Sequence, residues 1–195
     1  MELRPSRTLL SVGLALTLGG ACGENSDDET GAGATSTPQT TAKAAPSTTA
    51  GGAAKTLAVT GIDYAFTGVP ATVAAGTVVS FTNSSTKEVH ELVALRVKDG
   101  ETRPAPVLLQ LPEAERDAAA EFKGVLIAFP GEAGVAPQGP VTLSQPGRYL
   151  FVCTIPTGAD PAAYRAAAKN PGPPPEVPGG PPHVVAGMLS ELTVT

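Results

Sequence analysis

The apolar residues from Lys55 onward fall in short runs that are rich in β-branched residues and separated by Gly, Pro and polar turn residues. Runs of this length and composition, punctuated in this way, are typical of the strands of an all-β domain. The runs expected to be strands are 56–60, 62–66, 77–82, 89–97, 124–129, 141–144, 148–153 and 188–194, with Gly61 separating the first two. Residues 55–195 are therefore expected to form a β-sandwich or a β-barrel.

Two segments have the pattern of short helices. Pro112–Phe122 begins with proline and continues with an alanine-rich, charged body. It follows the 89–97 strand, in a long connection that we expect to cross from one sheet to the other. The second segment is Asp160–Lys169, with Asp160 as the N-cap and Pro161 at the first helical position.

The first 22 residues have the pattern of an export signal. Arg4 and Arg7 precede an apolar run, Leu9–Leu18, that is too short to span a bilayer. The run ends on Leu18-Gly19-Gly20-Ala21-Cys22, which resembles the lipobox of bacterial lipoproteins, although leucine lies four rather than three positions before the cysteine. Residues 1–22 are thus expected to be a signal peptide whose Cys22 is lipidated. The alternative is an ordinary cleaved signal with Cys22 lost or left free.

Residues 23–54 are dominated by Thr, Ala, Ser, Gly and Pro, with no apolar period. Such a segment cannot bury enough surface to offset the entropy of ordering, so we expect a disordered tether that holds the domain off a membrane. The formal net charge of the whole chain is −5, which is too mild and of the wrong sign for a nucleic-acid binder.

The rarest residue types converge on one kind of chemistry. The chain has two His, two Cys and two Met; with Met1 and Cys22 set aside, the remaining ones are His90, Cys153, His183 and Met188. A thiolate, imidazoles and a thioether form a soft ligand set that suits copper rather than magnesium or calcium. Each residue alone could equally be a core or surface residue, but an unpaired thiol is uncommon in an exported domain.

Three segments together resemble the cupredoxin family, of plastocyanins and azurins. They are Phe81-Thr82-Asn83 through His90-Glu91-Leu92-Val93, then Pro146-Gly147-Arg148-Tyr149-Leu150-Phe151-Val152-Cys153-Thr154, then His183-Val184-Val185-Ala186-Gly187-Met188. The resemblance covers about residues 56–195. It implies a Greek-key β-sandwich with one or two short helices in long connections.

The resemblance also implies a site and a function. His90, Cys153 and His183 would be the equatorial ligands of one type 1 (blue) copper, and Met188 its weak axial ligand. The function would be one-electron transfer, with Cys153 as the covalent route for the electron. His183 would be the partly exposed histidine at the surface where electrons are exchanged.

The sequence departs from the family pattern at two places. Glu91 stands where plastocyanin and azurin have an asparagine that ties the two ligand loops together, so this link is not predicted here. Cys153 and His183 are separated by 29 residues, where the best-known family members have only a few. The extra segment, 155–182, is rich in proline, which favours extended, stiff backbone. It is either a cap over His183 or a solvated loop without a role.

Other functions are less compatible with the sequence. Copper oxidases and nitrite reductases need several more histidines, and the chain has no G-x-S-x-G motif, so we do not expect an enzyme. Copper storage or delivery usually employs Met- or His-rich exposed sites, and a metal-free sandwich acting as a binding module stays as an alternative. We expect a monomer at the extracytoplasmic or periplasmic membrane face, held by its lipid anchor, with an unknown redox partner and no nucleic acid.

Overall fold

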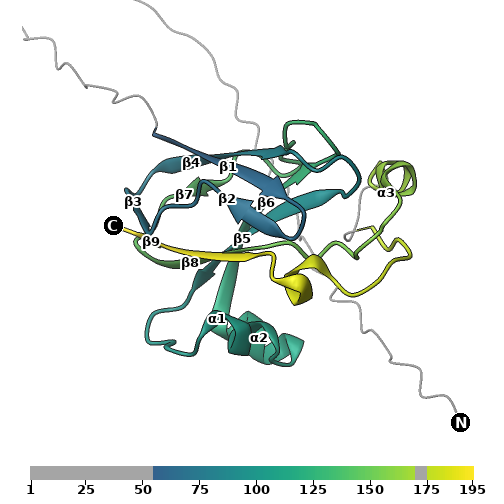
Figure 1. Cartoon of the computed structure of the whole chain (residues 1–195). Helices are drawn as coiled ribbons and strands as arrows, with labels where there is room; N and C mark the ends of the chain where they lie inside the picture. The colour runs from purple at the N-terminus through teal and green to yellow at the C-terminus, as the bar shows by residue number, and fades with distance from the viewer. Residues whose placement is uncertain (1–54, 170–174) are drawn as a thin grey trace, which may run out of the picture. The chain divides into compact units, whose positions relative to one another are not determined.

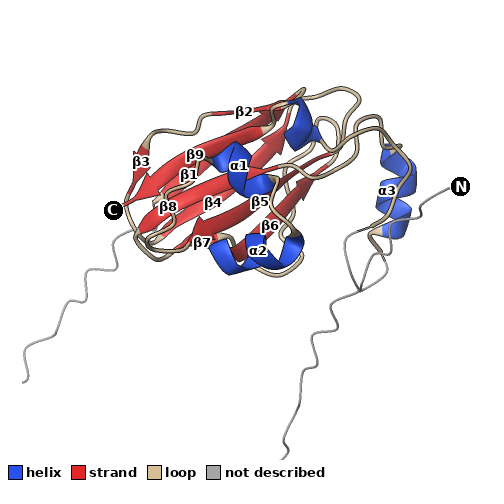
Figure 2. Cartoon of the chain, turned by 90° about the horizontal axis from the view of Figure 1, so that it is seen from below, coloured by secondary structure: helices blue, strands red, loops and turns tan. Residues whose placement is uncertain are grey.

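The computed structural model describes residues 55–169 and 175–195, which form two β-sheets packed face to face (Figures 1 and 2). The signal peptide 1–22 with Cys22 and the tether 23–54, both expected from the sequence, lie outside the described residues. No helix among the described residues is long and apolar enough to cross a membrane. The predicted β-sandwich is confirmed.

The first sheet has the strand order β2-β1-β4-β7. Its strands are β1 (Thr56–Ile62), β2 (Ala65–Thr67), β4 (Thr77–Asn83) and β7 (Thr142–Leu143). The two long strands, β1 and β4, run parallel, and the outer two are antiparallel to their neighbours.

The second sheet has the order β3-β9-β8-β5-β6. Its strands are β3 (Thr72–Val73), β5 (His90–Val97), β6 (Ala120–Ala128), β8 (Gly147–Val152) and β9 (Leu189–Val194). The three pairs among β9, β8, β5 and β6 are antiparallel, whereas β3 joins β9 in parallel. The two strands that carry the predicted ligands, β5 and β8, are therefore direct neighbours.

The main core lies between the sheets. Val59 and Phe81 of the first sheet are buried in one cluster with Leu92 and Phe151 of the second. β1 and β4 alternate buried and more exposed residues, as expected for strands with one face on the core and the other toward water. Burial of these apolar faces is the main contribution to the stability of the sandwich.

The second sheet is covered on its outer face as well. Leu150 and Val152 of β8 point away from the main core and are buried in a second cluster with Leu108. That cluster includes residues of α1 (Ala105–Leu109) and α2 (Glu113–Ala119), which lie over this face of the sheet (Figure 1). β8 is thus apolar on both sides, which explains its continuous run Tyr149–Val152.

The prediction that the α2 connection crosses between the sheets is wrong. α1 and α2 join β5 to β6, and these two strands are antiparallel neighbours within one sheet, with His90 opposite Ala128. Instead of crossing between the sheets, the long connection forms the helical layer over the outer face of the second sheet.

The predicted helices are confirmed in position. α2 begins after Pro112, as predicted, but ends at Ala119, because the chain enters β6 at residue 120. α3 (Pro161–Ala167) follows Asp160, whose side chain accepts a hydrogen bond from the Ala163 amide at 2.7 Å. α1 was not predicted.

The sequence suggested that Gly61 separates two strands, and this prediction is wrong. β1 continues through it to Ile62, and the turn falls at Asp63 and Tyr64. A Cβ at Gly61 would lie 2.8 Å from the Phe81 ring and 3.4 Å from Cδ2 of His90, so glycine is required by close packing rather than by a turn.

Candidate metal centre

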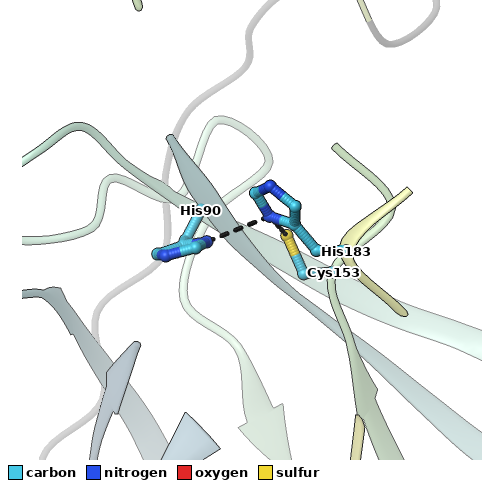
Figure 3. A group of neighbouring side chains, drawn as sticks. All are labelled: His90, Cys153 and His183. Atoms are coloured by element: carbon cyan, nitrogen blue, oxygen red, sulfur yellow. Dashed lines mark hydrogen bonds between the residues drawn. The ribbon is translucent and has the colours of Figure 1, made fainter. Parts of the chain in front are cut away.

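Three of the four predicted ligands meet at one end of the sandwich. His90 is the first residue of β5, Cys153 directly follows β8, and His183 begins the 3₁₀ helix η1 (His183–Ala186). β5 and β8 pair antiparallel through Val93 and Val152, which places the start of one beside the end of the other. One donor atom from each ligand lies within 4.8 Å of the others (Figure 3).

The donor atoms face one another directly. Nδ1 of His183 lies 3.1 Å from Nδ1 of His90 and 3.3 Å from Sγ of Cys153 (Figure 3). Ligands held about 2.0 to 2.3 Å from a metal in a trigonal arrangement lie roughly 3.5 Å apart. Nδ1 of His183 is therefore already close to the spacing that a bound ion needs from each of the other two donors.

The long segment between Cys153 and His183 is closed at its base. The His183 amide donates to the Ile155 carbonyl at 3.0 Å, and the Val184 amide donates to the Cys153 carbonyl at 2.8 Å. A bridge between Pro156 and Pro182 extends this pairing. The two ligands are thus close in space because the ends of the segment pair, whatever its length.

The insertion is not a solvated loop throughout. Ile155, Ala159 and Tyr164 are buried in the main core, and Tyr164, on α3, packs its ring against Phe129 with centroids 6.2 Å apart. Several prolines on which the expectation of stiff, extended backbone rested lie outside the described residues. The described part of the insertion has a structural role.

Met188, the fourth predicted ligand, is fully buried and is hydrogen-bonded through its backbone to two of the other three. Its amide donates to the His183 carbonyl at 3.0 Å, and its carbonyl accepts from the Cys153 amide at 3.3 Å. Gly187, in the left-handed conformation with φ of 108°, turns the chain between η1 and Met188. The backbone thus ties Met188 to two of the ligands, and its role as axial ligand stays a prediction.

Burial sets the protonation of the ligands. It lowers the pKa of His90 to about 4, and it also lowers the pKa of His183. Both imidazoles are therefore neutral at pH 7, which leaves a lone pair on each for a metal. Burial raises the pKa of the Cys153 thiol to about 12, so its proton leaves only when a cation replaces it.

His183 is not the partly exposed histidine that the family resemblance implies. Its side chain is 0% exposed. The Tyr64 ring lies edge-on to it, with ring centroids 5.1 Å apart, and Oε2 of Glu88 lies 3.3 Å from its Nε2. The same Glu88 oxygen accepts from the amide of Gly158, in the insertion, at 3.0 Å. The insertion thus contributes to the cover over this histidine.

A link between the ligand loops is present, although it could not be predicted from the sequence. Glu91 is buried, and its carboxylate accepts hydrogen bonds from both the amide and the hydroxyl of Thr154. Its own amide donates to the sulfur of Cys153 at 3.4 Å. Glu91, which follows the ligand His90, is therefore tied to Thr154, which follows the ligand Cys153. An asparagine is not required for this link.

The two histidines are held differently. His90 is fully buried, with Gly61 packed near its Cδ2 atom. Its Nε2 has no hydrogen-bond partner among the described residues. His183 instead has Glu88 at Nε2. In both rings Nδ1 is the nitrogen that faces the other donors.

A soft cation fits this site. Two bare Nδ1 lone pairs only 3.1 Å apart repel each other unless a proton or a cation lies between them. A set of two imidazoles and one thiolate is the equatorial set that suits type 1 copper. Among the described residues this is the single group of three or more metal-ligating side chains.

Comparison with known proteins gives likeness in overall structure only. The chain matches no protein-family model and no curated protein sequence. It is similar to the solved structure of a dithionite-reduced auracyanin from the photosynthetic bacterium Roseiflexus castenholzii, at 19% identity and a TM-score of 0.41, over 74% of this chain and 99% of that one.

Two further auracyanins are similar at the same level. Auracyanin B is 24% identical with a TM-score of 0.35, over 73% of this chain and 89% of its own. Auracyanin A, described as a "blue" copper protein from the green thermophilic photosynthetic bacterium Chloroflexus aurantiacus, is 18% identical with a TM-score of 0.36, over 72% and 98%. The fold and the site described above rest on this chain's own residues.

Sequence reasoning missed Glu88 and Tyr64. An acidic residue in a loop is usually solvated, and an isolated tyrosine between two strands has no pattern of its own. The one signal was proximity, because Glu88 lies two residues before His90.

Proposed function

We propose that this protein is a type 1 copper protein that carries single electrons. The observation that carries the proposal is the convergence of His90, Cys153 and His183 within 4.8 Å, all fully buried, at one end of a rigid sandwich. When bound there, copper supplies a one-electron couple between Cu(I) and Cu(II).

The protein's own residues provide the conditions for that couple. Nδ1 of His90, Nδ1 of His183 and Sγ of Cys153 would hold the ion, and Met188 would be the weak axial ligand. The links from Glu91 to Thr154 and from Glu88 to His183 would hold the ligands in place ahead of the ion. Little then has to move when the charge of the ion changes, which favours rapid electron exchange.

Copper storage or delivery is less compatible with this geometry. Handing an ion to another protein requires ligands that an incoming donor can reach, whereas the three ligands here are fully buried. An electron needs no such access. The same burial leaves no position for a substrate next to the ion, which supports a carrier rather than an enzyme.

For location, we propose that the chain is exported and held at the extracytoplasmic side of a membrane by lipid on Cys22. The support is the basic start, the apolar run and the lipobox-like end of residues 1–22, followed by a segment whose composition predicts a tether.

The partner would be a redox protein that meets the monomer at the end of the sandwich where η1 lies. Val185 of η1 is 71% exposed, two residues from the buried His183, and is the most exposed large apolar residue described. A small apolar contact here would bring a partner close to the ligands without a strong charge requirement.

A redox titration tests the proposal. The copper-loaded full chain should take up and release one electron per protein molecule, reversibly, over repeated cycles with ascorbate and ferricyanide. Stable copper binding without reversible cycling would support storage instead.

A further inference from the structure

Glu88 lies at a position that the copper ligands alone do not explain. Its side chain is only 13% exposed, and its carboxylate reaches three separate parts of the chain. Oε2 lies 3.3 Å from Nε2 of His183 and 3.0 Å from the Gly158 amide, and Oε1 lies 3.4 Å from the Tyr64 hydroxyl.

The backbone of Glu88 has hydrogen bonds of its own, separate from those of its side chain. Asn83, at the end of β4, donates through Nδ2 to the Glu88 carbonyl at 2.8 Å, and Ser85 accepts from the Glu88 amide at 2.9 Å. Asn83 and Ser85 are themselves buried. Glu88 is therefore held in a rigid turn two residues before His90.

Tyr64 is held in an unusual conformation on the other side. Its φ of 61° is the one positive value of a non-glycine residue among the described residues. Bulky residues adopt this region only when their surroundings impose it. Here the conformation places the tyrosine ring against His183 and its hydroxyl at Glu88.

The contact with Glu88 selects one tautomer of His183. A carboxylate only accepts hydrogen bonds, so Nε2 of the neutral imidazole must carry the proton. Nδ1 is then bare, and Nδ1 is the nitrogen that faces Cys153 and His90. His90 has no comparable partner at its Nε2 among the described residues, so the two imidazoles are not equivalent.

We infer that Glu88 is a positioning residue that presets His183 for copper and lowers the reduction potential of the site. The role rests on the copper site proposed above. The hydrogen bond to Nε2 fixes the ring and the tautomer. The negative charge, close to the ligands and partly shielded from water, favours Cu(II) over Cu(I).

Two variants separate the hydrogen bond from the charge. Glu88→Gln keeps an acceptor oxygen but removes the charge, and Glu88→Leu removes both at similar volume. Asp63→Asn is the control for the tautomer measurement. It removes an exposed carboxylate that acts electrostatically on both imidazoles, but it leaves the contact between Glu88 and His183 intact. Glu121→Gln is the distant control, since Glu121 lies opposite Arg96 in the strand register, toward the other end of the β5–β6 pair from His90.

The first readout needs no copper. In the ¹⁵N-labelled, copper-free full chain, long-range ¹H–¹⁵N correlation should show His183 protonated at Nε2 in the wild type, in Glu88→Gln and in Asp63→Asn. Glu88→Leu should show a mixture of tautomers. If Glu88→Leu keeps the wild-type tautomer with a well-dispersed spectrum, the positioning role is wrong, even if copper binds.

The second readout uses the copper-loaded chain. The reduction potential should rise in both Glu88 variants and stay unchanged in Glu121→Gln. The affinity for Cu(II) should fall about tenfold or more in Glu88→Leu. A wild type that binds no copper would contradict the proposed function but leave the tautomer result standing. Normal copper binding with an unchanged potential in both Glu88 variants would contradict the inference alone.

Discussion

At the scale of single residues, burial determines the protonation states of the ligands. His90, Cys153 and His183 are all fully buried, and removal from water favours the neutral form of each. Neutral imidazoles are ready to bind a cation, whereas the thiol must lose its proton when the ion arrives. Copper affinity should therefore fall as the pH falls, because each bound ion displaces the Cys153 proton.

The histidine pKa values predict how the copper-free protein responds to acid. The pKa of His90 is about 4 in the folded chain and about 6.5 when unfolded, so between these values the unfolded state binds more protons. Stability should be fully present above pH 6.5 and fall as the pH drops toward 4, by about 3 kcal/mol from His90 alone. Denaturant unfolding at pH 7 and pH 4.5 measures this.

The control is His90→Gln, which should lose the His90 share of this pH dependence. Glu91, whose pKa is raised by burial, acts in the opposite direction, but it is present in both proteins and cancels in the difference. Equal slopes in the two proteins would contradict the assignment.

Met188 should tune the potential rather than hold the copper. In Met188→Leu the blue colour should persist and the reduction potential should rise, because loss of a thioether donor disfavours Cu(II). Voltammetry beside an absorption spectrum measures both. Loss of copper from the variant would instead make Met188 an essential ligand.

At the scale of elements, the sequence predicts those whose pattern is local. Strands such as β1 and β4 are recognisable because their apolar residues alternate toward one core, and α3 is recognisable from Asp160 and Pro161. α1 was missed because five residues are too few to show a helical period. The burial of His183 was missed because it depends on Glu88 and Tyr64, which are distant in sequence.

The insertion should stabilise the fold through α3. Tyr164→Ala should reduce the free energy of unfolding of the copper-free chain by about 3 to 5 kcal/mol, since it removes a fully buried ring from the main core. Tyr164→Phe keeps the ring and should retain most of that stability. A change under 1 kcal/mol in Tyr164→Ala, measured by chemical denaturation, would mean that the insertion is merely tolerated.

At the scale of the whole molecule, the ligands gather at the end of the sandwich opposite the C-terminus (Figure 1). β5 supplies His90, β8 leads to Cys153, and the segment between η1 and β9 supplies Met188. The order and types of these residues were readable from the sequence because so few His, Cys and Met are present. Their spacing was not, because it depends on the β5–β8 register and on the pairing at the base of the insertion.

The N-terminal segment should decide where the protein resides. Cys22→Ser should release the protein from the membrane fraction, because it removes the residue that would carry the acyl chains. Fractionation followed by immunoblotting measures this, with Cys153→Ser as the cysteine control that should stay membrane-bound. Wild-type membrane association of Cys22→Ser would rule out lipid on this residue as the anchor.

The most direct test of the central claim is the absorption spectrum of the copper-loaded, oxidised full chain. One equivalent of Cu(II) should give an intense blue colour, from charge transfer between the Cys153 thiolate and the ion, and Cys153→Ser should lose it altogether. A wild-type protein that stays colourless with copper in excess under oxidising conditions would contradict the assignment of a type 1 site.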